Sequence, residues 1–225
     1  YREYRPYLFN TVFYVPISNI NYPNSLAKAG FQIEHKIWKK LRDIKPLRYS
    51  LQGPAKLYYH NAPRYWIRAM TSAPYFWNQR NGEQLSAQVK QLNFNHSDDA
   101  AVVGAVINSS LFYWWFVLLS DCRHLNRREI ENFPFDLENI NVYLKEKLMK
   151  HCRLLMTDYK KHSRRKETYY QSTGKVVYDE FYPKYSKSII DAIDNILAQY
   201  YHFSSEELDF IVNYDIKYRM SEILE

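Results

Sequence analysis

The sequence predicts an α+β fold, with a mixed, aromatic-rich N-terminal part and a helical C-terminal part. Short runs of aromatic and β-branched residues lie between residues 55 and 80, which is typical of strands. From Ser97 onward, apolar residues recur every three or four positions, which is typical of helices. Because the two signals occupy separate stretches of the chain, we expect a boundary near residue 140.

The first fifty residues combine extended segments with one helix. Residues 10–17, "NTVFYVPI", predict an extended segment. Residues 31–41, "FQIEHKIWKKL", carry a roughly helical apolar stripe. This helix would leave Lys36, Lys39 and Lys40 on its outward face.

Two strands are expected next. Residues 55–60, "AKLYYH", and residues 64–70, "RYWIRAM", are short and aromatic, and the link "NAP" between them can turn one back on the other. Side chains alternate faces along a strand, so Arg64, Trp66 and Arg68 would share one face.

A third strand is predicted over residues 73–80, "APYFWNQR", ahead of a loop marked by Asn81-Gly82. The pattern then changes to helix, with Ser97 as the expected N-cap. The apolar run of residues 100–119 approaches the length of a membrane span, but Gly104 and the triplet "NSS" interrupt it. We therefore expect a buried helix or helix pair.

Helices continue through the rest of the chain. Asn126 is expected to cap a short helix that stops at Pro134. A longer amphipathic helix should follow Asp136, with its apolar stripe formed by Leu144, Leu148, Cys152, Leu155 and Tyr159.

The basic run "KKHSRRK", residues 160–166, should lead into a polar loop that extends through Gly174. The spacing of apolar residues between Tyr185 and Tyr200 predicts another helix. A capping box formed by Ser204 and Glu207 marks the start of the last helix.

Composition and charge favour a polyanionic partner. The 225 residues include 22 Tyr, 12 Phe and 5 Trp, more aromatic rings than a core requires, and the formal net charge is +7. Residues 1–70 hold 12 Lys and Arg against 3 Asp and Glu, whereas the remainder holds 19 against 21. A localised basic, aromatic surface is typical of nucleic-acid binding, although a solvated basic face would give the same counts.

The residues needed for most enzymatic chemistry are missing. Two cysteines, Cys122 and Cys152, exclude a disulfide framework and a Cys-x-x-Cys zinc module, fit a reducing cytoplasm, and are each expected to be buried. We predict no structural metal. Five glycines form no phosphate-cradling turn, and no nucleophile elbow is present. We expect no catalytic residues, and the chain should hold no cofactor.

One alternative is a magnesium-dependent nuclease that uses Asp136, Glu146 and Lys147. These residues are more simply explained as part of a solvated helix. A second alternative is a single-stranded nucleic-acid binder that stacks bases on the tyrosines.

Recognition of a duplex agrees better with the 55–70 region. An arginine guanidinium can donate two hydrogen bonds to the major-groove edge of guanine and can also pair with phosphates. A two-stranded ribbon fits the major groove. The opposite possibility is that Trp66 lies in the core and the arginines are solvated. The candidate DNA-binding residues are Lys36, Lys39, Lys40, Lys56, Tyr59, His60, Arg64, Tyr65, Trp66 and Arg68.

Several segments together resemble a known family. They are "NAPRYWIRAM", "QLSAQVKQLNF", "VINSSLFYWWFVLLSDCRHLNRREIENFPF", "TGKVVYDEFYPKYSKSIIDAIDNIL" and "EELDFIVNYDIKYRM". They resemble the C-terminal target-recognition region of type IIG-like adenine-specific restriction-modification DNA methyltransferases, from about residue 50 to Met220. The most specific passage is "INSSLFYWWF…SD…LN…EI…FP".

The resemblance implies a module that reads double-stranded DNA while another domain methylates the base. That domain would carry the S-adenosylmethionine loop and the Asn-Pro-Pro-Tyr motif, neither of which occurs here, and the full-length enzyme would use S-adenosylmethionine and Mg. Residues 1–140 would then face DNA, and residues 141–225 would brace them or dock to an upstream methyltransferase domain. A first residue that is not Met fits a piece of a longer cytoplasmic protein, with no membrane partner.

Overall fold

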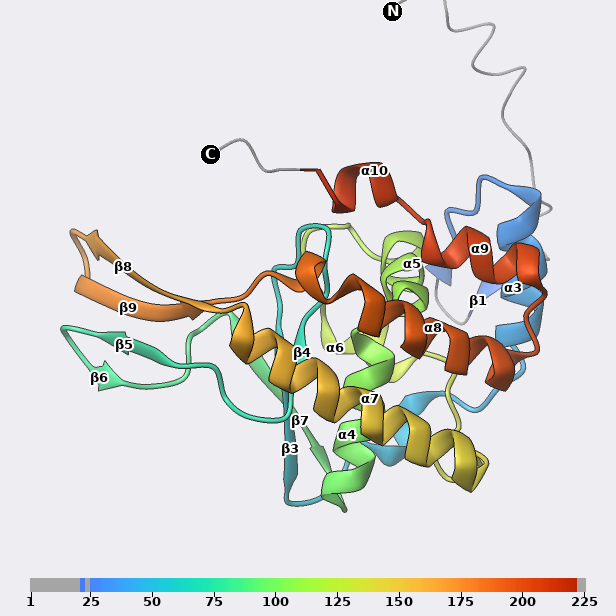
Figure 1. The fold of residues 1–225 in the computed structure, drawn as a ribbon, viewed down its shortest axis with the longest axis horizontal. Helices are drawn as coiled ribbons and strands as arrows, with labels where there is room; N and C mark the ends of the chain where they lie inside the picture. Colours follow the sequence, from blue (N-terminus) through green and yellow to red (C-terminus); the bar gives the residue numbers. More distant parts are fainter. Residues whose placement is uncertain (1–20, 23–24, 222–225) are drawn as a thin grey trace, which may run out of the picture.

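The structure is a computed structural model that describes residues 21–22 and 25–221. Figure 1 shows the arrangement of the chain. The helices are α3 (Gln32–Leu41), α4 (Ser97–Ile107), α5 (Ser110–Leu119), α6 (Arg127–Glu131), α7 (Val142–Lys161), α8 (Lys187–Tyr201), α9 (Ser205–Val212) and α10 (Ile216–Arg219), with 3-10 turns at η1 (Leu47–Ser50) and η2 (Pro183–Ser186). The strands are β1 (Asn21–Tyr22), β2 (Ser25–Leu26), β3 (Ala55–His60), β4 (Ala69–Met70), β5 (Phe76–Asn78), β6 (Gly82–Glu83), β7 (Val89–Phe94), β8 (Arg164–Tyr170) and β9 (Gly174–Glu180).

The expected α+β class is confirmed, because helices and antiparallel sheets are both present. The described sheets have the strand orders β1-β2, β4-β3-β7 and β6-β5-β9-β8. Strand β3 pairs with β4 through Tyr59 and Ala69 and with β7 along its full length, from Ala55 opposite Phe94 to His60 opposite Val89. The predicted strand over residues 55–60 is therefore confirmed, as is the return of the chain after it.

Helix α4 forms the centre of the core. Every residue from Ala100 to Ile107 is buried, because α7 packs on one side of α4 and the β3 sheet packs on the other. This explains why α4 is apolar all round. Helix α5 continues the core, and the expected helix pair is confirmed. Among the described residues no single helix is long and apolar enough to cross a membrane; α4 and α5 pass that test only together, and they are bent by 69°.

The break between α4 and α5 is held by Asn108. Its Nδ2 donates to the carbonyl oxygens of Ala69 (2.8 Å) and Gly104 (2.7 Å). Its Oδ1 accepts from the Ala69 amide (3.1 Å) and the Tyr159 hydroxyl (2.9 Å). One buried side chain thus joins β4, α4 and α7 and uses all four of its hydrogen-bonding positions.

Local helix signals are reproduced closely. Asn126 and Glu129 form a capping box at α6, and Ser204 and Glu207 form one at α9, as predicted. The stripes of α3, α7 and α8 face the core. Helix α4 is a small exception, since its N-cap is His96 and Ser97 is the first helical residue.

The predicted strand over residues 64–70 is wrong for most of its length. Only Ala69 and Met70 pair with β3, and residues 64–68 are irregular. The indole Nε1 of Trp66 donates to the carbonyl oxygen of Arg219 (2.9 Å), so this segment is held by the C-terminal α10 rather than by a sheet. The predicted sharing of one face by Arg64, Trp66 and Arg68 is lost with the strand.

The predicted polar loop through Gly174 is also wrong. Strands β8 and β9 form a hairpin, from Arg164 opposite Glu180 to Tyr170 opposite Gly174. Strand β9 also pairs with β5, which joins segments from both sides of residue 140 in one sheet. We call this sheet, residues 76–83 and 164–180, the arm. Figure 1 shows the arm extending away from the helices.

The two cysteines differ from each other. Cys152 is buried as expected, and burial raises the pKa of its thiol to about 12. Cys122 was also expected to be buried, but it is exposed on the loop after α5 with φ at 60°. Residues 10–17 lie outside the described residues, so the extended segment expected there stays a prediction.

Candidate nucleic-acid interface

The predicted interface residues fall in three places, and the first is the outer face of α3. Lys39 is exposed there without an ion pair to a described residue. Lys40 Nζ lies 2.6 Å from Glu207 on α9, and Lys36 Nζ lies 3.9 Å from Glu206. Acidic residues therefore offset two of the three positive charges, and α3 is a weak candidate for phosphate binding.

The second place is β3. Lys56 is exposed, but Tyr59 is only 4% exposed and packs in the core, where burial raises the pKa of its hydroxyl. His60 Nδ1 accepts from the Ala62 amide (3.3 Å), and its Nε2 lies 3.0 Å from Gln88 Oε1. Burial, and next the charge of Arg68, lower the pKa of His60, which favours a neutral ring. Only Lys56 of these residues is open to a polyanion.

The third place is the segment after β3. Arg64 and Tyr65 are exposed, and the Tyr65 ring stacks on Tyr218 of α10, with 6.4 Å between the ring centres. Trp66 is half-buried. The Arg68 guanidinium lies over the Phe181 ring at 4.7 Å, and burial lowers the pKa of Arg68. The structure thus presents Arg64 and Tyr65 at the surface and draws Trp66 and Arg68 inward.

The segment that precedes Arg64 meets two other loops. The Asn61 amide donates to the carbonyl oxygen of Gln88 (2.8 Å), and the Asn61 carbonyl oxygen accepts from the Leu125 amide (2.9 Å). Residues 61–65, 86–88 and 120–126 therefore meet at Asn61, and we call them the loop cluster. Sequence reasoning missed the third of these loops as a functional candidate.

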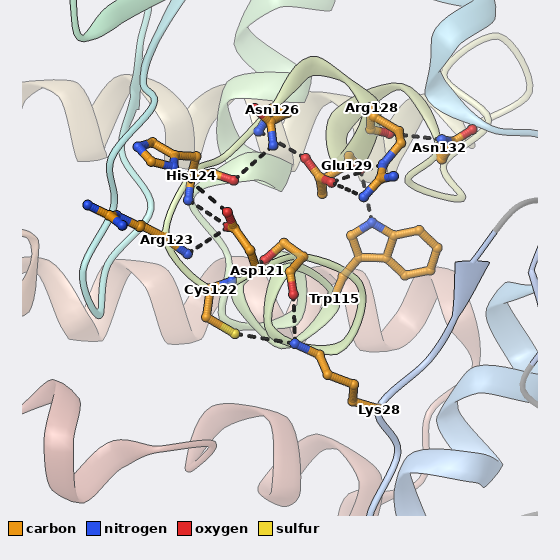
Figure 2. Close-up of polar contacts among 11 residues, drawn as sticks. Lys28, Trp115, Asp121, Cys122, Arg123, His124, Asn126, Arg128, Glu129 and Asn132 are labelled. Atoms are coloured by element: carbon orange, nitrogen blue, oxygen red, sulfur yellow. Dashed lines mark hydrogen bonds and ion pairs between the residues drawn. The ribbon is translucent and has the colours of Figure 1, made fainter.

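The 120–126 loop has a fixed shape, shown in Figure 2. Asp121 Oδ1 accepts from the backbone amides of Arg123 and His124, at 2.9 Å each. These hydrogen bonds lower the pKa of the Asp121 carboxyl. Ser120 Oγ accepts from the Cys122 amide at 2.9 Å. In Figure 2 the side chains of Arg123 and His124 extend to the same side of the loop, away from Trp115.

The base of this loop is anchored on both sides. On one side, Lys28 Nζ donates to the carbonyl oxygen of Ser120 (2.7 Å). On the other side, the buried Glu129 completes the α6 capping box by accepting from the Asn126 amide (2.9 Å). Trp115 Nε1 donates to the carbonyl oxygen of Glu129 (2.9 Å). The loop therefore rests on buried elements that hold it in place.

The exposed charges of the loop cluster are mostly positive. Within the part of the chain that the structure describes, Arg64 and Arg123 make no ion pair. Asp121 is the opposing charge, and His124 Nδ1 lies 3.8 Å from it. Asp121 accepts hydrogen bonds from two backbone amides, and these partly offset its negative charge within the loop. The sequence signal for this loop is a short "SD" ahead of basic residues. An Asp closes a turn by accepting hydrogen bonds from the backbone amides two and three residues later.

Two residues of the nuclease alternative make local contacts. Asp136 accepts from the amides of Glu138 (3.2 Å) and Asn139 (3.3 Å) and so shapes the turn before α7. Glu146 is exposed on α7, and Lys147 Nζ lies over the Tyr143 ring at 4.1 Å. Among the described residues, no group of three or more His, Cys, Asp or Glu is placed to hold a metal ion.

No protein-family model, curated protein or solved structure matches this chain.

Proposed function

We propose that this chain is a sequence-specific duplex DNA recognition module of an adenine-specific restriction-modification methyltransferase, with the catalytic motifs outside these 225 residues. The observation that carries the proposal is the loop cluster. Arg64 and Arg123 project from neighbouring loops, and neither makes an ion pair with a described residue. Arginine is well suited to this role, because its fork pairs with guanine edges and with phosphates.

The rigidity of the cluster supports sequence reading rather than loose electrostatic attachment. The 120–126 loop is closed by Asp121 and anchored through Ser120 and Glu129 by hydrogen bonds within the protein. Side chains held in place lose little conformational freedom on binding, which favours a specific contact. Tyr65, 43% exposed beside Arg64, adds a flat surface that can pack on sugars.

The passage that carries the family resemblance has a structural role here. Asn108 joins three elements at the α4–α5 break, Asp121 closes the loop, and Glu129 anchors it. These residues form a framework, and the exposed residues beside them are free to differ. A rigid framework with exposed side chains beside it suits a module that reads DNA, and Arg64 and Arg123 are our candidates for the reading residues.

The experiment is fluorescence anisotropy of the chain on a labelled random-sequence duplex and on its single strand, across a salt series. We expect preference for the duplex and an affinity that falls steeply with salt. Arg64→Ala and Arg123→Ala should each weaken binding to a selected site by about 1–3 kcal/mol where the arginine contacts a base. Lys150→Ala, at an exposed position on α7, is the matched control and should bind as the wild type does.

Two results would contradict the proposal. Absence of duplex binding at low salt would show that the chain does not bind DNA by itself. Equal or tighter binding to the single strand would instead assign the exposed tyrosines to base stacking. If both arginine variants lose the same amount of affinity on every DNA sequence, the chain still binds DNA, but these side chains contact phosphates rather than bases.

A further inference from the structure

The arm is a second exposed surface that the loop cluster does not include. Its four strands extend beyond the helical body (Figure 1). Aromatic side chains lie on both faces of the sheet. The register places Phe76 and Tyr178 on one face and Trp77 and Val177 on the other, all of them half-buried. A small sheet without a packed layer over it gains little stability from burial. We therefore expect its exposed end to contact a partner.

The two turns at the end of the arm are fastened to each other. The Gln79 amide donates to the carbonyl oxygen of Lys175 (2.8 Å), and the Lys175 amide donates to Gln79 Oε1 (3.1 Å). Gly174 has φ at +70°, and a Cβ there would lie 2.4 Å from Gln79 Oε1. Asn78 Oδ1 also accepts from the Asn81 amide (2.7 Å). The paired turns therefore form one ordered tip, residues 79–82 and 169–175.

The tip itself contains no carboxylate. The arm has four, and one of them, the exposed Glu83, directly follows the tip. Arg165 holds Asp179 with two hydrogen bonds of 2.6 and 3.1 Å. Lys166 lies 3.6 Å from Glu180, and Lys175 lies 2.7 Å from Glu167. The exposed side chains of the tip are amides, hydroxyls, two cations and two tyrosines: Gln79, Arg80, Asn81, Tyr169, Tyr170, Gln171, Ser172 and Lys175.

We propose that the tip of the arm inserts into a groove of duplex DNA, as a contact separate from the loop cluster. This inference rests on the proposed function. The B-DNA major groove is about 12 Å wide and admits a two-stranded ribbon such as the β8–β9 hairpin of the arm, and its base edges pair with amides and arginine. Arg80, which makes no ion pair with a described residue, gives the tip a positive charge that complements a polyanion, and the exposed Glu83 directly after the tip is the nearest opposing charge along the chain. Tyr169 and Tyr170, 74% and 54% exposed, would pack on the walls of the groove.

The test compares tip variants with matched variants on α7. Arg80→Gln and the double variant Tyr169→Ser with Tyr170→Ser remove exposed side chains, so the fold should persist, which circular dichroism would verify. On a random-sequence duplex we expect each to bind about tenfold more weakly, with the log–log salt slope of Arg80→Gln reduced by about 1. Lys150→Gln and Tyr143→Ser, both exposed on α7, should bind like wild type.

The outcomes separate this inference from the proposed function. If wild type binds duplex, the tip variants lose affinity and the α7 variants do not, the arm contacts DNA. If wild type binds duplex and the tip variants bind equally well, the arm contact is overturned while duplex recognition by the loop cluster stands. If wild type does not bind duplex at low salt, both proposals are overturned together.

Discussion

The guanidinium carbon of Arg219 lies 4.0 Å from the centre of the Trp66 ring, and Trp66 Nε1 donates to the carbonyl oxygen of Arg219. The same guanidinium lies 4.8 Å from the Tyr113 ring, and its Nη1 donates to Ser110 Oγ (3.1 Å). Residues far apart in the chain thus form one buried contact. Helix α10 therefore holds the segment that follows Arg64.

Arg219→Gln should lower the free energy of unfolding by about 2–3 kcal/mol. The change removes a desolvated cation over two aromatic rings and a buried hydrogen bond. Chemical denaturation would measure the loss. Lys217→Gln, at an exposed position on the same helix, should change stability by less than about 0.5 kcal/mol. Equal stability of Arg219→Gln and wild type would show that the cation contributes nothing.

Asp194 predicts a pH dependence of stability. Its two carboxyl oxygens accept from the Ser110 and Leu111 amides, but burial outweighs these bonds and raises the pKa from 3.8 to about 6. Between those pH values the folded chain keeps a proton that the unfolded chain releases, so the free energy of unfolding falls as pH rises from about 4 to about 6. Asp194→Asn removes this titration.

The measurement is urea denaturation of wild type and Asp194→Asn at several pH values between 4 and 7. As pH rises over this range, the unfolding free energy of wild type should fall relative to that of Asp194→Asn by roughly 3 kcal/mol. Parallel pH profiles for the two proteins would contradict a raised pKa of Asp194.

Asn108→Ala should cost about 3 kcal/mol or more. The substitution leaves the Ala69 backbone groups and the Tyr159 hydroxyl without their buried partner. Thermal or urea unfolding would measure the change. Asn213→Ala, at an exposed position, is the control, and its stability should stay within about 0.5 kcal/mol of wild type. A similarly small loss of stability in Asn108→Ala would show that the hydrogen bonds of Asn108 do not hold β4, α4 and α7 together.

Asp121→Ala should loosen the 120–126 loop without unfolding the protein. The Arg123 and His124 amides lose their acceptor, so hydrogen exchange at these amides should become faster while the melting temperature stays close to wild type. Asp121→Asn keeps an acceptor oxygen and should restore much of the protection. Unchanged exchange in Asp121→Ala would show that the carboxylate does not shape the loop.

Local signals account for the parts of the fold that were predicted correctly. The α6 and α9 caps each need only residues three apart, and the α7 stripe repeats within one helix, so neighbouring positions suffice. The errors arise from distant partners. Residues 64–68 alternate like a strand, but Trp66 bonds to Arg219, 153 residues away. Strand β8 looks polar because most of its side chains are exposed, and its partner β9 itself pairs with β5.

The candidate site shows the same limit. The basic and aromatic composition pointed to Arg64 and Tyr65, which are exposed, but also to Tyr59, which is buried. Composition alone does not show which face of β3 is buried and which is exposed, because that depends on the elements that pack against each face. Arg123 was missed because the meeting of its loop with residues 61–65 depends on the hydrogen bond from the Leu125 amide to the Asn61 carbonyl oxygen.

The pairing of β5 with β9 also governs how the chain is made. Phe76 lies opposite Tyr178, about 100 residues later. At a synthesis rate of about 5–20 residues per second, β5 leaves the ribosome roughly 5–20 s before its neighbour exists. Throughout that interval one edge of the aromatic strand around Trp77 lacks its partner β9, although β6 can pair with the other edge. An open strand edge is the kind of surface that chaperones bind and that aggregates. Translation pauses between residues 80 and 180 should therefore lower the yield of folded protein more than the small size of the arm suggests.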